Sequence, residues 1–165
     1  MLDLGRILID GAIVSLVASA ALTAVLWFNP RLLLNDYPQA IRDLVPAKTE
    51  RESRLGLIVG MPFLLVLLLG PLISTIVMEG RAAGTVPFWA LATHAFGVGF
   101  VFNLVDLVLI DWLVFCTITP GFLVLPGSEG AEGYKDYAYH ARAALKGTVF
   151  CVLWGLIVGA IVYVL

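Results

Sequence analysis

Four long apolar stretches, separated by shorter polar segments, dominate the pattern of hydrophobic and polar positions along the chain. They cover residues 7–28, 55–78, 86–117 and 147–165. Each has the roughly 20 apolar residues that a helix needs to cross the hydrocarbon core of a bilayer. No alternation with a period of two is visible, so the stretches predict helices rather than strands. We therefore expect an all-α integral membrane protein whose residues 1–165 form a single transmembrane domain, a four-helix bundle.

The composition favours the same class. Hydrophobic residues make up 61% of the chain and charged residues 13%, and the mean hydropathy is +0.99. A soluble domain has about 45–50% apolar and about 25% charged residues. No basic patch is dense enough for nucleic acid, which excludes that class of partner. The first partner that the composition predicts is the lipid bilayer.

Lys and Arg residues gather on one side of the predicted bundle. The connections that follow the first and third stretches, with the helix starts beside them, hold eight of the ten, and only Arg6 and Arg81 belong to the other side. Basic residues are enriched in cytoplasmic loops. We therefore expect cytoplasmic connections and two external termini, in a bacterial inner membrane or a plasma membrane.

The two basic connections carry signals for short interfacial helices. In the first, Asn35 and Asp36 precede Pro38 as a helix start, and Thr49 and Glu52 have the spacing of a capping box ahead of the second long helix. In the second connection, three residues are candidates for a site at the cytoplasmic interface: Tyr137, His140 and Arg142. This segment is either a juxtamembrane anchor or a substrate-facing helix in which His140 titrates near neutral pH.

The third stretch contains the polar residues of greatest interest, namely His94, Asn103, Asp106 and Asp111. A charged carboxylate near the middle of a bilayer costs at least about 2.5–3.5 kcal/mol, so it needs a partner, water or a raised pKa. Asn103 and Asp106 share a helix face because they are three residues apart. In an α-helix Asp106 and Asp111 point about 140° apart, which is a poor arrangement for paired acid–base chemistry.

Each polar residue has a structural and a functional interpretation. For Asp111 we expect an ion pair with Arg54 or Lys146, and for Asp106 either a structural hydrogen bond or a proton or cation relay. His94 lies about 18 Å along the helix from Asp106, so the two cannot share a metal ion, and we expect a hydrogen-bonded packing residue. Asp10 is expected to contact water. No metal site and no cofactor is predicted.

Small residues predict where helices approach closely. An i+4 ladder of small residues follows the first helix, and two GxxxG motifs lie in the second and fourth helices. The residues are Gly11, Ser15, Ser19, Thr23, Gly56, Gly60, Gly155 and Gly159. Either motif could act within the bundle or between protomers.

Three functional hypotheses follow. The leading one is non-enzymatic: an accessory or structural membrane subunit that forms a homo-oligomer or binds another membrane protein. The alternative is an oligomeric proton- or cation-coupled transporter or channel that uses Asp106. A second alternative is a membrane enzyme that acts on lipid or quinone at the cytoplasmic interface, and it requires Asp111, Tyr137 and His140 to converge.

Overall fold

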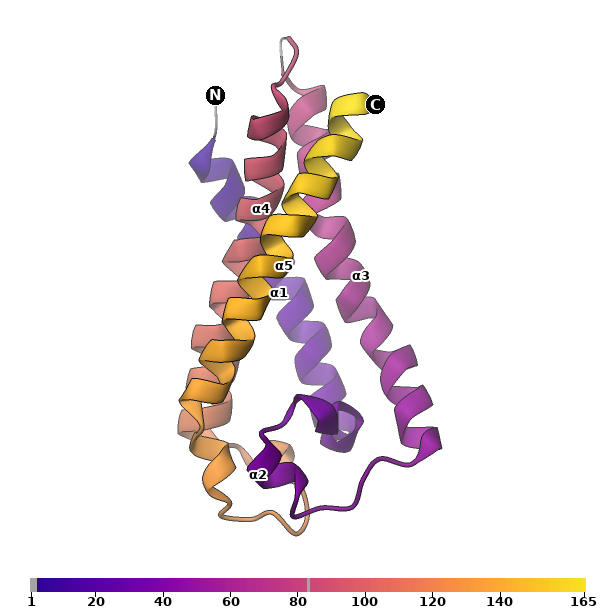
Figure 1. The fold of residues 1–165 in the computed structure, drawn as a ribbon, viewed down its shortest axis with the longest axis vertical. Helices are drawn as coiled ribbons and strands as arrows, with labels where there is room; N and C mark the ends of the chain where they lie inside the picture. Colours follow the sequence, from indigo (N-terminus) through magenta and orange to yellow (C-terminus); the bar gives the residue numbers. More distant parts are fainter. Residues whose placement is uncertain (1–2, 83) are drawn as a thin grey trace.

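The computed structural model describes residues 3–82 and 84–165, and four long helices make up most of them (Figure 1). The first two are α1 (Leu4–Phe28) and α3 (Glu50–Gly80). The third consists of α4 (Phe88–Val105) and its continuation η2 (Asp106–Ile118), and the fourth is α5 (Tyr137–Val164). Each is long and apolar enough to cross a membrane. The prediction of an all-α four-helix bundle is confirmed, and the described residues include no strand.

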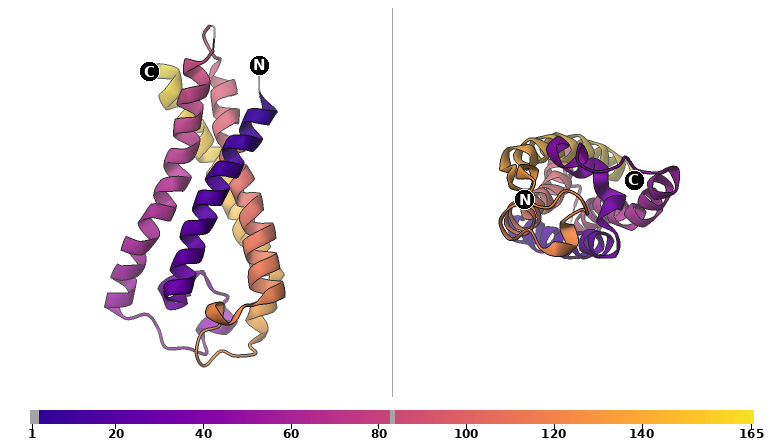
Figure 2. Two further views of the ribbon diagram at one scale, coloured as in Figure 1. Left: turned by 180° about the vertical axis from the view of Figure 1, so that it is seen from behind. Right: turned by 90° about the horizontal axis from the view of Figure 1, so that it is seen from below.

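The helices converge at one end and spread apart at the other (Figures 1 and 2). The start of α1 and the end of α5 lie at the narrow end, which we call the terminal end. The two long connections close the wide end, which we call the connection end. The helix α5 follows α4 closely, whereas α3 diverges from α5 toward the connection end. The bundle therefore has a tightly packed half and a half in which space opens between the helices.

The connections are folded. They contain η1 (Pro30–Asp36), α2 (Gln39–Arg42), η3 (Gly121–Leu123) and η4 (Glu132–Lys135). Tyr37 and Tyr134 are buried in a shared apolar cluster, and the Tyr37 hydroxyl donates to the Leu123 carbonyl at 2.9 Å. These contacts join the two connections into one base beneath the helices.

The start of α3 agrees with the sequence prediction, whereas the start of α5 does not. Thr49 and Glu52 form the predicted capping box at the start of α3. The helix α5 begins at Tyr137, ten residues before the predicted span at 147, because Asp136 caps it by accepting from the Tyr139 backbone N–H at 2.8 Å. The segment expected to be a separate juxtamembrane helix is therefore the first part of α5, which makes His140 rigid with respect to the bundle.

Glycines set the close approaches of the terminal half. A Cβ at Gly155 would lie 2.9 Å from the Ala92 carbonyl oxygen, and one at Gly159 would lie 2.8 Å from the Ala92 Cα, so α5 and α4 are in backbone contact. Gly11 in α1 packs closely against the side chain of Val101 in α4. By contrast, Gly60 has no atom within 4 Å of its Cβ position. Of the two GxxxG motifs, only the one in α5 joins two long helices.

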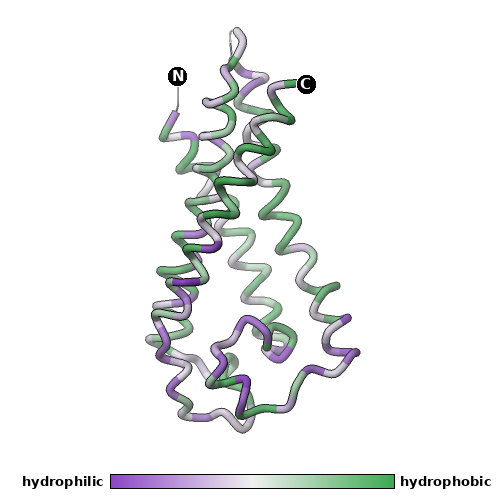
Figure 3. Tube along the Cα trace, viewed as in Figure 1, coloured by the Kyte–Doolittle hydropathy of each residue, from purple (hydrophilic) through white to green (hydrophobic). Residues whose placement is uncertain are grey.

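The outer surfaces of the long helices are apolar, as Figure 3 shows along most of their length. Side chains such as Leu57, Ile58 and Ile73 of α3 are more than half exposed. Polar residues concentrate at the connection end. This is the distribution expected of helices that face lipid.

Candidate functional site at the connection end

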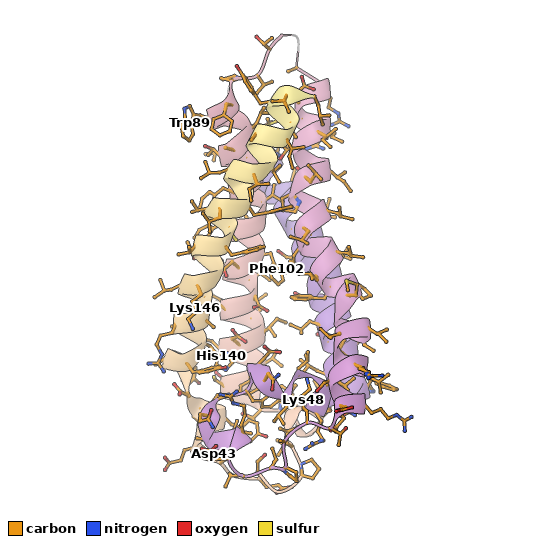
Figure 4. The ribbon with its side chains drawn as sticks, turned by 45° about the vertical axis from the view of Figure 1, so that its right-hand side comes forward. Asp43, Lys48, Trp89, Phe102, His140 and Lys146 are labelled. Atoms are coloured by element: carbon orange, nitrogen blue, oxygen red, sulfur yellow. The ribbon has the colours of Figure 1, made fainter. Side chains whose placement is uncertain are left out.

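A cavity of about 600 Å³ lies where the helices spread apart, above the base formed by the connections. Its walls come from α1, α3, η2 and α5, and most of its lining is apolar. The polar side chains that line it are Thr23, Asp36, Tyr37, Asp106, Asp111, Tyr139 and His140. Figure 4 shows His140 near the connection end of α5, below Phe102. Among the polar residues predicted in the third helix, Asp106 and Asp111 reach this cavity.

A change of helix type brings these two aspartates to the same cavity. From Asp106 onward the third helix is a π-helix, in which residue i pairs with residue i+5. Residues five apart therefore lie nearly above each other, and both Asp106 and Asp111 face the cavity. The expectation that the two carboxylates point about 140° apart is wrong because it assumed α-helical geometry.

The end of the π-helix is stabilised by the second connection. Thr119 adopts a left-handed conformation with φ 48°, and its N–H donates to the Val114 carbonyl, five residues back, at 2.8 Å. The Lys135 ammonium donates to the Cys116 carbonyl at 2.6 Å and to the Thr119 hydroxyl at 2.9 Å. A cation at a helix C-terminus satisfies carbonyls that have no partner in the helix. Lys135 therefore acts on the helix end and does not enter the cavity.

Asp111 and His140 form a pair across η2 and α5. The His140 Nδ1 lies 3.0 Å from Asp111 Oδ1, and His140 is 5% exposed. The rings of Phe115 and Tyr139 pack on the imidazole, with centroids 4.8 and 5.3 Å away. The expected ion pair of Asp111 with Arg54 or Lys146 is not formed, because the imidazole occupies that position. The Nε2 atom of His140 is buried and has no hydrogen-bond partner among the described residues.

Asp106 has no protein partner among the described residues. Its Oδ1 atom is buried without a hydrogen bond, and the carboxyl group lines the cavity. Asn103, one turn earlier, is committed to helix packing, since its amide donates to the Ala144 carbonyl and to the Thr148 hydroxyl, both at 3.1 Å. Asn103 therefore joins α4 to α5 and plays no part in the cavity.

Asp36, Tyr37 and Tyr139 line the cavity although the sequence analysis did not predict them as site residues. Asp36 lines the cavity from η1, and the Tyr139 hydroxyl donates to its backbone carbonyl at 3.3 Å. Protein atoms crowd the Asp36 carboxyl although part of it is accessible, and this desolvation raises its pKa against the opposing effect of Lys48 and Arg42. Burial likewise raises the pKa of Tyr37. No short-range sequence pattern links these residues to Asp106, since the tertiary fold alone brings them together.

Two of the predicted interface candidates lie outside the cavity. The Tyr137 hydroxyl shares a hydrogen bond of 3.0 Å with Thr117, and its backbone carbonyl accepts from the Trp112 indole at 3.2 Å. Arg142 is exposed on α5. Of the set Asp111, Tyr137 and His140, only the first and last converge.

A second polar cluster lies at the terminal end and joins α1, α3 and α4. Asp10 accepts from Arg6 Nε at 2.8 Å and from the Ser74 hydroxyl at 2.6 Å. The Ser74 oxygen also lies 2.8 Å from His94 Nε2. The prediction that His94 is a hydrogen-bonded packing residue is confirmed, and His94 is fully buried. Asp10, which we expected to contact water, is partly buried, with its side chain 11% exposed.

A packed apolar layer separates the two clusters. Val14, Ala18, Val98 and Phe102 are buried together, with Phe63 packed against them. Within the described residues, no three His, Cys, Asp or Glu side chains gather in a way that could hold a metal ion. The cavity is therefore closed toward the terminal end and offers organic hydrogen-bonding groups rather than a metal cage.

Comparison of the chain with protein-family models, with curated proteins and with solved structures gives no match. Function is therefore inferred from the geometry of the cavity itself.

Proposed function

We propose that this chain is a multi-pass membrane protein that binds one small amphipathic molecule in the cavity at the connection end. The polar head of that molecule would contact Asp106 and the Asp111–His140 pair, and its apolar part would lie along the cavity walls. The observation that carries the proposal is the presence of two buried polar atoms without partners, Asp106 Oδ1 and His140 Nε2, on residues that line a largely apolar cavity.

The energetics of these two atoms favour an occupant. A buried donor or acceptor left without a hydrogen bond costs about 1–3 kcal/mol, and more for a charged group. A ligand that supplies hydrogen-bond donors would remove that cost for both atoms. A volume of about 600 Å³ also falls within the roughly 300–1,000 Å³ typical of small-molecule sites, which are apolar with a few polar groups.

The expected membrane orientation gives the ligand a route. The basic residues of the connection end favour its placement on the cytoplasmic side, so the cavity would lie in the cytoplasmic half of the bilayer. Only Gly60 and Phe63 of α3 line the cavity, and α3 diverges from α5 at this level (Figure 2). We propose that an amphiphile enters from the lipid between α3 and α5.

The test uses photoreactive single-chain amphiphiles with twelve carbons and three different heads, an amine, an alcohol and a carboxylate. At least one should label the cavity peptides containing residues 106–115 and 139–143 in the protein held in lipid nanodiscs. Gly60→Leu should abolish this labelling, because its side chain would enter open space within the cavity.

Gly80→Leu is the matched control. Gly80 also has no atom within 4 Å of its Cβ position, and it ends α3 at the opposite end of the bundle. Labelling in this variant should equal that of the unmodified protein. Absence of cavity labelling by all three probes, or equal labelling in Gly60→Leu, would contradict the proposal.

A second candidate function rests on the Asp111–His140 pair. A carboxylate that accepts from Nδ1–H orients an imidazole so that Nε2 can act as a general base. An enzyme of this kind would hydrolyse a lipid ester held in the cavity. The assay is hydrolysis of a p-nitrophenyl ester in micelles. Loss of this activity in His140→Gln and its retention in Tyr137→Phe would favour the enzyme. Equal rates in the His140 variant would exclude it.

Transport through Asp106 and an accessory role are two alternative proposals. The apolar layer around Val98 and Phe102 closes the cavity toward the terminal end, so transport would require a second conformation. It predicts a pH-dependent flux in liposomes that Asp106→Asn abolishes. An accessory subunit predicts co-purification of another membrane protein or a defined homo-oligomer, with the exposed apolar face of α3 as the contact.

A further inference from the structure

We infer that the cavity takes an amphiphile with a cationic head, namely a protonated organic amine bound between Asp106 and the Asp111–His140 pair. This inference rests on the proposed function and names the class of ligand. It follows from the charge of the lining, from the hydrogen-bonding state of His140 and from the donors that the two unpartnered atoms require.

The lining carries three acidic side chains, and His140 is its one side chain that can take up a positive charge. Three carboxylates line the cavity, those of Asp36, Asp106 and Asp111, and none of the lining residues is Lys or Arg. An anionic head such as a phosphate would meet these carboxylates without a compensating charge. A cation would be attracted by them, the more strongly because the apolar walls lower the local dielectric.

Basic residues near the base of the cavity are engaged elsewhere. Lys48 donates to the Leu32 carbonyl, and Lys135 donates to carbonyls at the end of η2. Arg31 pairs with Glu52 at 2.7 Å. Lys48 and Arg42 act on the Asp36 carboxyl from outside the cavity, but no Lys or Arg lines the cavity beside Asp106 and Asp111.

The hydrogen bond to Asp111 sets the tautomer of His140. With Asp111 ionised, His140 Nδ1–H is the donor of the 3.0 Å contact. In the neutral imidazole the other nitrogen, Nε2, is then an acceptor. Asp106 Oδ1 is also an acceptor, so both unpartnered atoms require hydrogens from a ligand. A primary ammonium offers three donors and a positive charge, whereas an alcohol offers one donor and no charge.

A metal cation fits the site less well than an organic one. The described residues form no group of three His, Cys, Asp or Glu side chains suited to a metal. Most of the remaining lining is apolar and includes Leu22, Leu26 and Phe122. A bare ion would leave these walls uncovered, while the hydrocarbon part of an alkylamine would cover them.

The experiment compares the three photoreactive probes at neutral pH. The ammonium adds to the hydrogen bonds a charge–charge attraction that the alcohol lacks, and a tenfold preference requires only about 1.4 kcal/mol. The amine should therefore label the cavity peptides at concentrations about tenfold or more below those needed for the alcohol. The carboxylate should be the weakest of the three.

Variants of the cavity show whether the preference for the amine probe depends on Asp106. Asp106→Asn should reduce the preference for the amine to near that for the alcohol, and Asp106→Glu should retain it. Asp43→Asn removes the same charge from an exposed position at the same end of the molecule, outside the cavity, and should leave the preference unchanged.

The outcomes separate the two proposals. Cavity labelling that is blocked by Gly60→Leu but is equal for the three heads, or strongest for the carboxylate, overturns the inference and leaves the proposed function standing. A preference for the amine that persists in Asp106→Asn also overturns it. Absence of cavity labelling with every probe overturns both.

Discussion

The two ends of the bundle each contain a carboxylate and a histidine between helices, yet they use them differently. At the terminal end, Asp10 accepts from both Arg6 and Ser74, and Ser74 also contacts His94. At the connection end, Asp111 holds one nitrogen of a histidine, while Asp106 has no protein partner among the described residues. His94 Nδ1 is also buried without a partner in the described part of the chain, but His94 lies within a packed joint of three helices, whereas the unpartnered atoms of the connection end belong to residues that line a cavity of about 600 Å³.

Backbone spacing explains the difference. Glycines at the terminal end let helices touch, as Gly97 does against Ile7 and Gly159 does against Ala92. Polar groups on such helices are forced within hydrogen-bonding distance of one another. At Gly60 no neighbour lies within 4 Å, and the helices around it are far enough apart to enclose a cavity. The small residues thus decide where the helices pack directly and where they enclose a cavity.

The largest effect on stability should come from replacing one glycine by alanine at each end of the bundle. Gly159→Ala places a Cβ 2.8 Å from the Ala92 Cα, and overpacking of this kind costs about 1–3 kcal/mol. The Cβ added by Gly60→Ala has no neighbour within 4 Å, so this variant should stabilise the helix by up to about 1 kcal/mol. Thermal unfolding in mild detergent, followed by circular dichroism, measures both. Equal stability of the two variants would show that the ends are packed alike.

The next effect should come from breaking the terminal-end cluster at Ser74. Ser74→Ala removes a hydrogen bond to Asp10 and the contact with His94, and each buried group left unsatisfied costs about 1–3 kcal/mol. The unfolding temperature should fall clearly. Ser53→Ala, on an exposed position of the same helix, is the control and should change it little. A Ser74 variant as stable as this control would mean that the cluster does not hold the three helices together.

Much of the fold could be predicted from the sequence, because long apolar stretches and a capping box are local signals. The helix bounds of α1 and α3, the buried state of His94 and the role of Gly155 and Gly159 agree with the structure. These features depend on residues within a few turns of one another or on a single small side chain.

The site was less accessible from the sequence, for two physical reasons. The relation between Asp106 and Asp111 depends on a π-helix, and an apolar pattern read with α-helical geometry places them on different faces. The contributions of Asp36 and Tyr139 depend on how distant connections fold against each other, and no local spacing encodes that. Asp111 and His140 were named together with Tyr137 in the enzyme hypothesis, but only the tertiary structure shows that these two pair and that Tyr137 does not join them.

A third and smaller effect on stability should come from replacing aspartate by asparagine at each end of the bundle. Asp10→Asn weakens the pairing with Arg6 and the bond from Ser74, and because Arg6 is 32% exposed the loss should be about 1 kcal/mol. Asp106→Asn removes a charge that has no protein partner, so it should raise the unfolding temperature of the ligand-free protein. Thermal unfolding of both variants under the same conditions shows whether each substitution raises or lowers the unfolding temperature. A destabilised Asp106→Asn variant would reveal a stabilising contact of the Asp106 carboxylate.

The smallest effect concerns Asp36 at the base of the cavity, and it depends on pH. Because its pKa in the folded protein is raised, the folded state binds the proton more tightly than the unfolded state. The contribution of Asp36 to stability is therefore greatest below its unfolded pKa of about 3.9 and falls as the pH rises through the folded pKa. Asp36→Asn should stabilise the protein at neutral pH, relative to Asp43→Asn as a control for the lost charge, and this gain should vanish near pH 3.5. A gain that grows toward acid pH would instead mean that Lys48 or Arg42 stabilises the ionised carboxyl, and the connection end would then resemble the terminal end in pairing its charges.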